Sequence, residues 1–175
     1  MLACVKIISM KMLRENIKGA EPEVKTWVNF HKMGDTLFYK IKAFNSSLNS
    51  FSDKDNDALY RGDTVEVFLD LGDKDFYYEF EVAPNGAVFV AKKFSNHLEF
   101  IDKSFFHAES KIDGNDYEVL MEIDLSNFAP YKTIRHNVFR IETKGIKSDY
   151  ILAALEPTLC KSFHVRSKFV EFIDD

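Results

Sequence analysis

The stretch FYYEFEV, residues 76–82, decides the fold class of this 175-residue chain. Its even-numbered positions are aromatic or aliphatic, and its odd-numbered positions hold Tyr77, Glu79 and Glu81. Successive side chains of a β-strand point to opposite faces of a sheet, so this alternation predicts a strand with one face on a core and one wetter face.

The same period of two recurs outward from this stretch, at residues 37–43 and 117–125. The segment TVEVFLD, residues 64–70, is apolar on both faces, because Phe68 lies opposite to Val65, Val67 and Leu69. It therefore predicts a central strand covered on both sides. Turn signals separate the runs, at residues 33–35, 72–74, 84–86 and 113–115. Short strands at this cadence predict an all-β protein, an antiparallel two-sheet β-sandwich of jelly-roll type, with residues 1–175 in a single domain.

The segments between these runs have less regular patterns. Residues 1–13 are apolar with interspersed lysines and predict a first strand, while residues 13–20 predict an irregular connector. Residues 126–131 predict a single helical turn before the next strand. The polar segments 45–57 and 94–103 predict two long connecting loops, which are common places for binding residues on a rigid sandwich.

The charge and hydropathy of the sequence argue against two classes of partner, nucleic acids and membranes. The net charge is −5 and acids and bases are interleaved, so no basic block is present to track a phosphate backbone, and nucleic acid is not expected. No apolar run reaches the roughly 20 residues of a membrane helix, so no membrane partner is expected. The first residues do not read as a signal peptide, which predicts a cytoplasmic protein, or a secreted one if a leader has been removed. Cys4 and Cys160 are interpreted as two buried thiols.

Signatures of catalysis are missing, so the sequence predicts a protein that is not an enzyme: no nucleophile elbow, phosphate loop, dinucleotide fingerprint or zinc-protease motif occurs. Glu66 and Glu81 could form the carboxyl pair that a glycosidase needs. The default interpretation is that both face solvent, as alternate glutamates on a soluble sheet usually do.

A weak signal for calcium occurs in the loop 45–57. Asp53, Asp55 and Asp57 have a spacing that can form an oxygen cage, although the glycine and the distal glutamate of an EF-hand loop are missing. The default interpretation is a solvated loop. No cofactor is expected with certainty, and a structural calcium ion is the one candidate.

Two acidic residues, Asp63 and Glu66, enter the otherwise apolar segment 59–70. A buried carboxylate costs several kcal/mol unless it is hydrogen-bonded or bound to a cation, so each is expected to have a task. Either they tie down loop backbone or pair with Arg61 or Arg140, or one of them accepts hydrogen bonds from the hydroxyls of a ligand.

Four ordered blocks carry a resemblance to a known family: YRGDTVEVFLD at 60–70, YYEFEVAPNG at 77–86, NVFRIE at 137–142, and EPT followed by SFHV in 156–165. Together with the later Phe169, the pattern resembles that of family 9 carbohydrate-binding modules and their DOMON-like relatives, over residues 27–172. Several blocks in order are much more specific than one short motif.

The resemblance implies a jelly-roll sandwich in which two aromatic rings clamp a terminal sugar. By position, Tyr60 and Phe163 stand at the two clamp positions, Glu66 at a sugar-binding carboxylate, and Glu81 where a binding arginine can stand. It also implies a sugar or polysaccharide as the partner, and a glycoside hydrolase acting on the same polymer. Structural calcium occurs in some members.

Departures from the family pattern keep three functions open. Neither clamp position holds tryptophan, and Arg166 stands where proline is usual. The first interpretation is a non-catalytic carbohydrate-binding domain. The second is a sandwich whose sugar site has degenerated and which now serves as an interaction or structural domain, and a glycoside-acting enzyme is a distant third.

Overall fold

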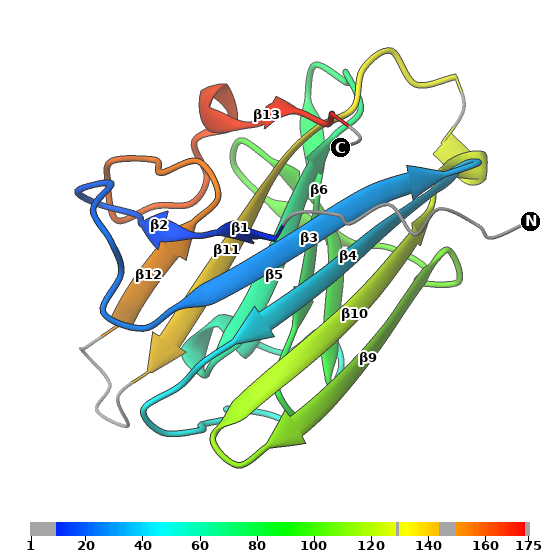
Figure 1. Cartoon of the computed structure of the whole chain (residues 1–175). Helices are drawn as coiled ribbons and strands as arrows, with labels where there is room; N and C mark the ends of the chain where they lie inside the picture. Colours follow the sequence, from blue (N-terminus) through cyan, green and yellow to red (C-terminus); the bar gives the residue numbers. More distant parts are fainter. Residues whose placement is uncertain (1–9, 129, 144–149, 174–175) are drawn as a thin grey trace, which may run out of the picture.

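The computed structural model describes residues 10–128, 130–143 and 150–173, which form two antiparallel sheets packed face to face (Figure 1). The first sheet has the strand order β1 (Lys11–Met12), β3 (Thr26–Met33), β4 (Thr36–Ala43), β10 (Asp116–Asp124) and β9 (Phe106–Asp113). The predicted two-sheet antiparallel sandwich is confirmed.

The second sheet contains the two predicted strands that hold Glu66 and Glu81. Its order is β2 (Arg14–Glu15), β12 (Tyr150–Ala154), β11 (Arg135–Thr143), β5 (Thr64–Asp70), β6 (Phe76–Val82), β7 (Val88–Phe94) and β8 (Leu98–Phe100), and β13 (Val170–Glu171) pairs with β11. Strand β5 lies at the centre, between β11 and β6.

The main core fills the space between the two sheets. Val65, Val67 and Leu69 of β5 belong to it, whereas Phe68 belongs to a second apolar cluster. All seven residues of β5 are buried, so the prediction of a central strand covered on both sides is confirmed.

The closing segment, residues 160–169, covers part of the second sheet on the side away from the main core. Phe163 stacks on Phe139 of β11, with ring centroids 4.3 Å apart, and Phe169 meets the ring of Tyr77 edge-on at 5.0 Å. These contacts form the second apolar cluster. The Phe68 face of β5 is therefore buried by residues about 95 positions further along the chain.

Arg166 fastens the closing segment to the end of β5. Its guanidinium donates to both carboxylate oxygens of Asp70, from Nε at 2.8 Å and from an Nη at 2.7 Å. It also donates to the backbone carbonyls of Asp73 and Lys74. Burial acts to raise the pKa of Asp70, but the hydrogen bonds from Arg166 and Gly72 outweigh it, and the pKa is lowered.

Several segments differ from expectation. The predicted connector 94–103 contains strand β8, because β7 is followed by a tight turn that returns along it. Of the predicted first strand, residues 1–9 lie outside the described part, and only Lys11–Met12 is assigned as a strand; the connector after it contains β2. The predicted helical turn is the 3₁₀ helix η2 (Leu125–Phe128).

The predictions for the two cysteines and for a membrane have separate outcomes. Cys160 is a free thiol and only half-buried, so it is less buried than expected, and Cys4 lies outside the described residues. Within the described ranges, no helix is both long and apolar enough to cross a membrane.

Candidate functional site

A cavity of about 330 Å³ opens on the face of the second sheet that carries the closing segment. Tyr60, Glu66, Glu81 and Phe163 all line it. The structure therefore brings together, around one cavity, the four residues that the sequence picked out as a ligand site.

The two aromatic residues at this cavity differ in their surroundings. Tyr60 lies in the 3₁₀ helix η1 (Leu59–Arg61) and is 52% exposed, whereas Phe163 is only 7% exposed and stacks on Phe139. The Tyr60 ring is free to contact a ligand, while one face of Phe163 is already used in packing.

Glu66 and Glu81 lie directly opposite each other in the pairing of β5 with β6. They are 2% and 1% exposed, so the default interpretation of solvent-facing glutamates is wrong. The reason is tertiary: the face that would be wet in an isolated sheet is covered by η1 and by the closing segment.

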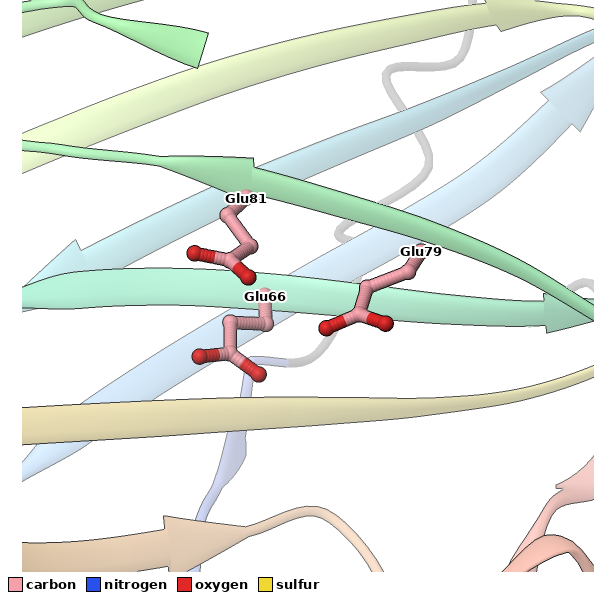
Figure 2. A group of neighbouring side chains, drawn as sticks. All are labelled: Glu66, Glu79 and Glu81. Atoms are coloured by element: carbon pink, nitrogen blue, oxygen red, sulfur yellow. The ribbon is translucent and has the colours of Figure 1, made fainter. Parts of the chain in front are cut away.

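A third glutamate, Glu79, joins this pair and was missed as a site residue. It lies two positions before Glu81 on β6, is 6% exposed, and lines the same cavity. Figure 2 shows the three carboxyl groups on one side of the sheet, reached from β5 and β6. The signal was present in the sequence, since the alternation at 77–82 places Glu79 and Glu81 on one face.

The electrostatics of the three carboxyl groups are dominated by burial. Burial and the neighbouring Glu79 raise the pKa of Glu66 well above its usual range, and burial with the charge of Glu66 does the same for the pKa of Glu81. Burial raises the pKa of Glu79 to about 7. The interaction with Glu81 and the charge of Lys93 act to lower the pKa of Glu79, but burial outweighs both.

His164 and two lysines complete the polar part of the lining. His164 stacks on Phe68 at 5.3 Å, and its Nδ1 lies 2.6 Å from the hydroxyl of Tyr77. Lys93 of β7 is half-buried and Lys161 is exposed, and both line the cavity.

Asp63, the other acidic residue of the segment 59–70, has a structural task. Its carboxylate accepts hydrogen bonds from the backbone N–H and the hydroxyl of Thr143, at 2.7 and 3.1 Å. It also accepts from the backbone N–H of Asn49 at 2.9 Å and from the amide of Asn45 at 3.3 Å. Of the alternatives for Asp63, tying down loop backbone is the one observed, and no ion pair with Arg61 or Arg140 occurs among the described residues.

The calcium candidates of the loop have other partners. Asp55 accepts from the backbone N–H of Val88 and pairs with Lys103, and Asp57 accepts from the backbone N–H of Ala58. Asp53 is exposed. Across the described ranges, one group of three metal-ligating side chains converges within 4.8 Å, and it consists of Glu66, Glu79 and Glu81 instead of these aspartates.

Comparison with known proteins identifies solved structures that have a similar fold. No protein-family profile and no curated protein sequence matches the chain. Among solved structures, two complexes of a family 9 carbohydrate-binding module from Caldicellulosiruptor kristjanssonii, one with cellotriose and one with glucose, align over 93% of this chain. Their TM-scores are 0.65 and 0.64, at 15% and 16% identity, with 77% and 79% of the neighbour covered. The chain has the fold of a family 9 carbohydrate-binding module.

A further structure has the same fold at a higher score. It is a protein from Bacteroides uniformis ATCC 8492 inferred to bind carbohydrate, with a TM-score of 0.75 at 20% identity over 93% of this chain and 84% of that one. The family 9-like fold that the sequence blocks predicted is therefore confirmed at the level of architecture.

Proposed function

We propose that this chain is a non-catalytic carbohydrate-binding domain whose site is the cavity beside Tyr60. The observation that carries the proposal is the content of that cavity: an exposed aromatic ring stands beside buried carboxyl groups that retain free oxygens. The fold supports it, since two neighbours with the same architecture are described in complex with cellotriose and glucose.

The chemistry of the cavity suits a sugar. An aromatic face packs against the apolar C–H side of a pyranose, and the ring of Tyr60 is available for this contact. The carboxyl oxygens of Glu66 and Glu81 can accept hydrogen bonds from hydroxyl groups at the base of the cavity. A site of about 330 Å³ lies within the usual range for small-molecule pockets.

One observation favours the second candidate, a sandwich that has lost its sugar site and serves as an interaction domain. Phe163 is only 7% exposed and its ring stacks on Phe139, so little of its surface can reach a ligand. A clamp of Tyr60 and Phe163 would therefore be unequal, with most of the stacking on Tyr60. If the site is active, we expect the protein to act beside an enzyme that degrades the same polysaccharide.

The test is a glycan-array screen of the purified chain, followed by calorimetric titration of each hit. We expect Tyr60→Ala and Glu66→Ala to abolish binding. Tyr150→Ala is the matched control, because Tyr150 is 43% exposed on β12 and does not line the cavity, and it should bind as the parent does. Absence of any hit at millimolar sugar would favour the interaction domain, and release of reducing sugar from a hit would show an enzyme.

A further inference from the structure

Three carboxyl groups converge at the base of the cavity with unsatisfied oxygens. One donor oxygen from each of Glu66, Glu79 and Glu81 lies within 4.8 Å of the other two. Each side chain is more than nine-tenths buried, and each has an oxygen with no hydrogen-bond partner: Oε1 of Glu66 and Oε2 of the other two. All three residues line the cavity, and their unpartnered oxygens are themselves covered from solvent. Figure 2 shows the three carboxyl groups gathered where β5 and β6 run side by side.

The protein around this cluster supplies too little positive charge for it. The ion pairs formed by the described residues do not include any of the three glutamates. The cavity lining contributes two lysines, Lys161 and Lys93, and the charge of Lys93 acts to lower the pKa of Glu79 without outweighing burial. Adjacent buried carboxylates repel one another and are poorly solvated, so they either hold protons or bind a cation. A cation placed among them would compensate all three groups at once.

Other buried groups without partners do not offer a comparable site. Tyr117 OH, Arg140 Nε and Glu142 Oε2 belong to the network at the opposite, inner side of β11, and His136 packs among Phe30, Tyr39 and Phe172 in the core. A second cavity of similar volume adjoins the turn at residues 71–75, but none of the unpartnered buried atoms lines it. The glutamate cluster is where unsatisfied carboxylates and an open cavity coincide.

We propose that Glu66, Glu79 and Glu81 bind one Ca²⁺ ion at the base of this cavity, and that its remaining coordination positions face the cavity and take ligand hydroxyls. Carboxylate oxygens are the ligands that Ca²⁺ prefers, at about 2.3–2.6 Å, so two oxygens on one ion can be up to about 5 Å apart. The separations in the cluster meet this limit. Binding of the ion stands on the cluster alone, and its role as a bridge to hydroxyls rests on the proposed function.

This site differs from the calcium candidates in the loop 45–57 in its consequence for a ligand. An ion held among the aspartates would stabilise the loop only, whereas an ion on the glutamates contacts the cavity itself. Two of the four ligand-site candidates, Glu66 and Glu81, would then act on a sugar through the ion instead of directly.

The first experiment titrates CaCl₂ alone into chain that has been stripped with EDTA and dialysed, with calorimetry as the readout. We expect one equivalent of Ca²⁺ to bind, and we expect Glu66→Gln, Glu79→Gln and Glu81→Gln each to weaken it by about tenfold or more. Glu122→Gln, the same change at an exposed position on β10 of the other sheet, should bind as the parent does. Unfolding curves in EDTA show whether each variant is folded, and the three variants provide independent tests.

A second readout locates the ion. Tb³⁺, a luminescent substitute for Ca²⁺, should be sensitised by the tyrosines nearest the cluster, Tyr60 and Tyr77, and the signal should fall in Tyr60→Phe and in the glutamate variants. No binding at millimolar CaCl₂, or binding that all three glutamine variants retain, would overturn the site. Binding of glucosamine but not glucose in EDTA, lost in Glu66→Gln, would also overturn it, because the cluster would then hold an ammonium group.

The bridge to a sugar is tested separately, by titrating a glycan-array hit with Ca²⁺ present and with EDTA. We expect EDTA to weaken sugar binding at least tenfold and Ca²⁺ to restore it. Sugar binding that EDTA leaves unchanged would contradict the bridge and leave the proposed function standing. Ca²⁺ binding without any sugar hit would contradict the proposed function and leave the ion site standing.

Discussion

Two buried acidic regions lie within a few residues of each other and have opposite surroundings. Asp63, just before β5, is fully buried and accepts hydrogen bonds from Thr143, Asn49 and Asn45. Glu66, three residues later, is equally buried, but one of its oxygens has no partner and its neighbours are two more glutamates. The role of a buried acid therefore depends on how many hydrogen-bond donors surround it, and burial alone does not define that role.

The Asp63 region should give the largest loss of stability on mutation. We expect Asp63→Ala to lower the free energy of unfolding by about 4 kcal/mol, because several buried donors lose their charged acceptor together. Asp63→Asn, which keeps one acceptor oxygen, should lose less. Urea denaturation measures both, and an Asp63→Ala loss below about 1 kcal/mol would show that the loop is held by other contacts.

The acids of the glutamate cluster should have the opposite effect on stability at neutral pH. The pKa of Glu79 is raised from 4.5 to about 7, so the folded state holds its proton more tightly than the unfolded chain does. Its contribution to stability is complete below pH 4.5 and is lost as the pH rises through 7. The shift corresponds to about 3 kcal/mol.

Glu79→Gln removes this dependence, and the measurement is urea unfolding of parent and variant in EDTA at pH 4, 6 and 8. We expect the variant to lose less stability than the parent across this range. Other charged and titratable groups around the cavity also contribute to the pH dependence of stability: Glu66, Glu81, Tyr77, Lys93, Lys161 and His164. Comparing the variant with the parent isolates the part that is due to Glu79. Parallel pH profiles for the two proteins would contradict the raised pKa.

Arg166 bears on the glutamate cluster indirectly, because it fastens the closing segment that covers the glutamates. Among the described residues, Arg166→Ala leaves Arg135 as the one ion-pair partner of the Asp70 carboxylate, at 3.8 Å. We expect a loss of about 2 kcal/mol, together with weaker ligand binding as the closing segment loosens. Arg166→Lys keeps the charge but cannot form the paired hydrogen bonds, so its free energy of unfolding should lie between those of the parent and Arg166→Ala. Unchanged unfolding in Arg166→Ala would show that the aromatic contacts alone hold the segment.

The smallest effect on stability is expected at Tyr60. Tyr60→Ala should change the free energy of unfolding by less than about 1 kcal/mol because the side chain is half exposed, whereas Phe163→Ala should cost about 3 kcal/mol because its ring is buried against Phe139. Thermal unfolding distinguishes the two. A large loss in Tyr60→Ala would mean that the ring packs against the sandwich instead of serving a ligand.

The period-two patterns were sufficient to predict strands, two sheets and the double-sided burial of β5, because side-chain direction alternates within one strand whatever its neighbours are. Local spacing also placed Glu79 on the face of Glu81. The four ordered blocks 60–70, 77–86, 137–142 and 156–165 further predicted the family 9-like sandwich. These features depend on residues that are close together in the sequence.

Only the tertiary structure showed which glutamates are buried and which acid is satisfied. Whether a strand face is wet depends on what covers it, and here the cover is the segment 160–169, held through Asp70 and Phe139. Asp63 receives its donors from Thr143, 80 positions away, and Glu66 faces Glu81 through the pairing of β5 with β6. Contacts between distant segments arise from packing of the whole chain, so no local pattern encodes them.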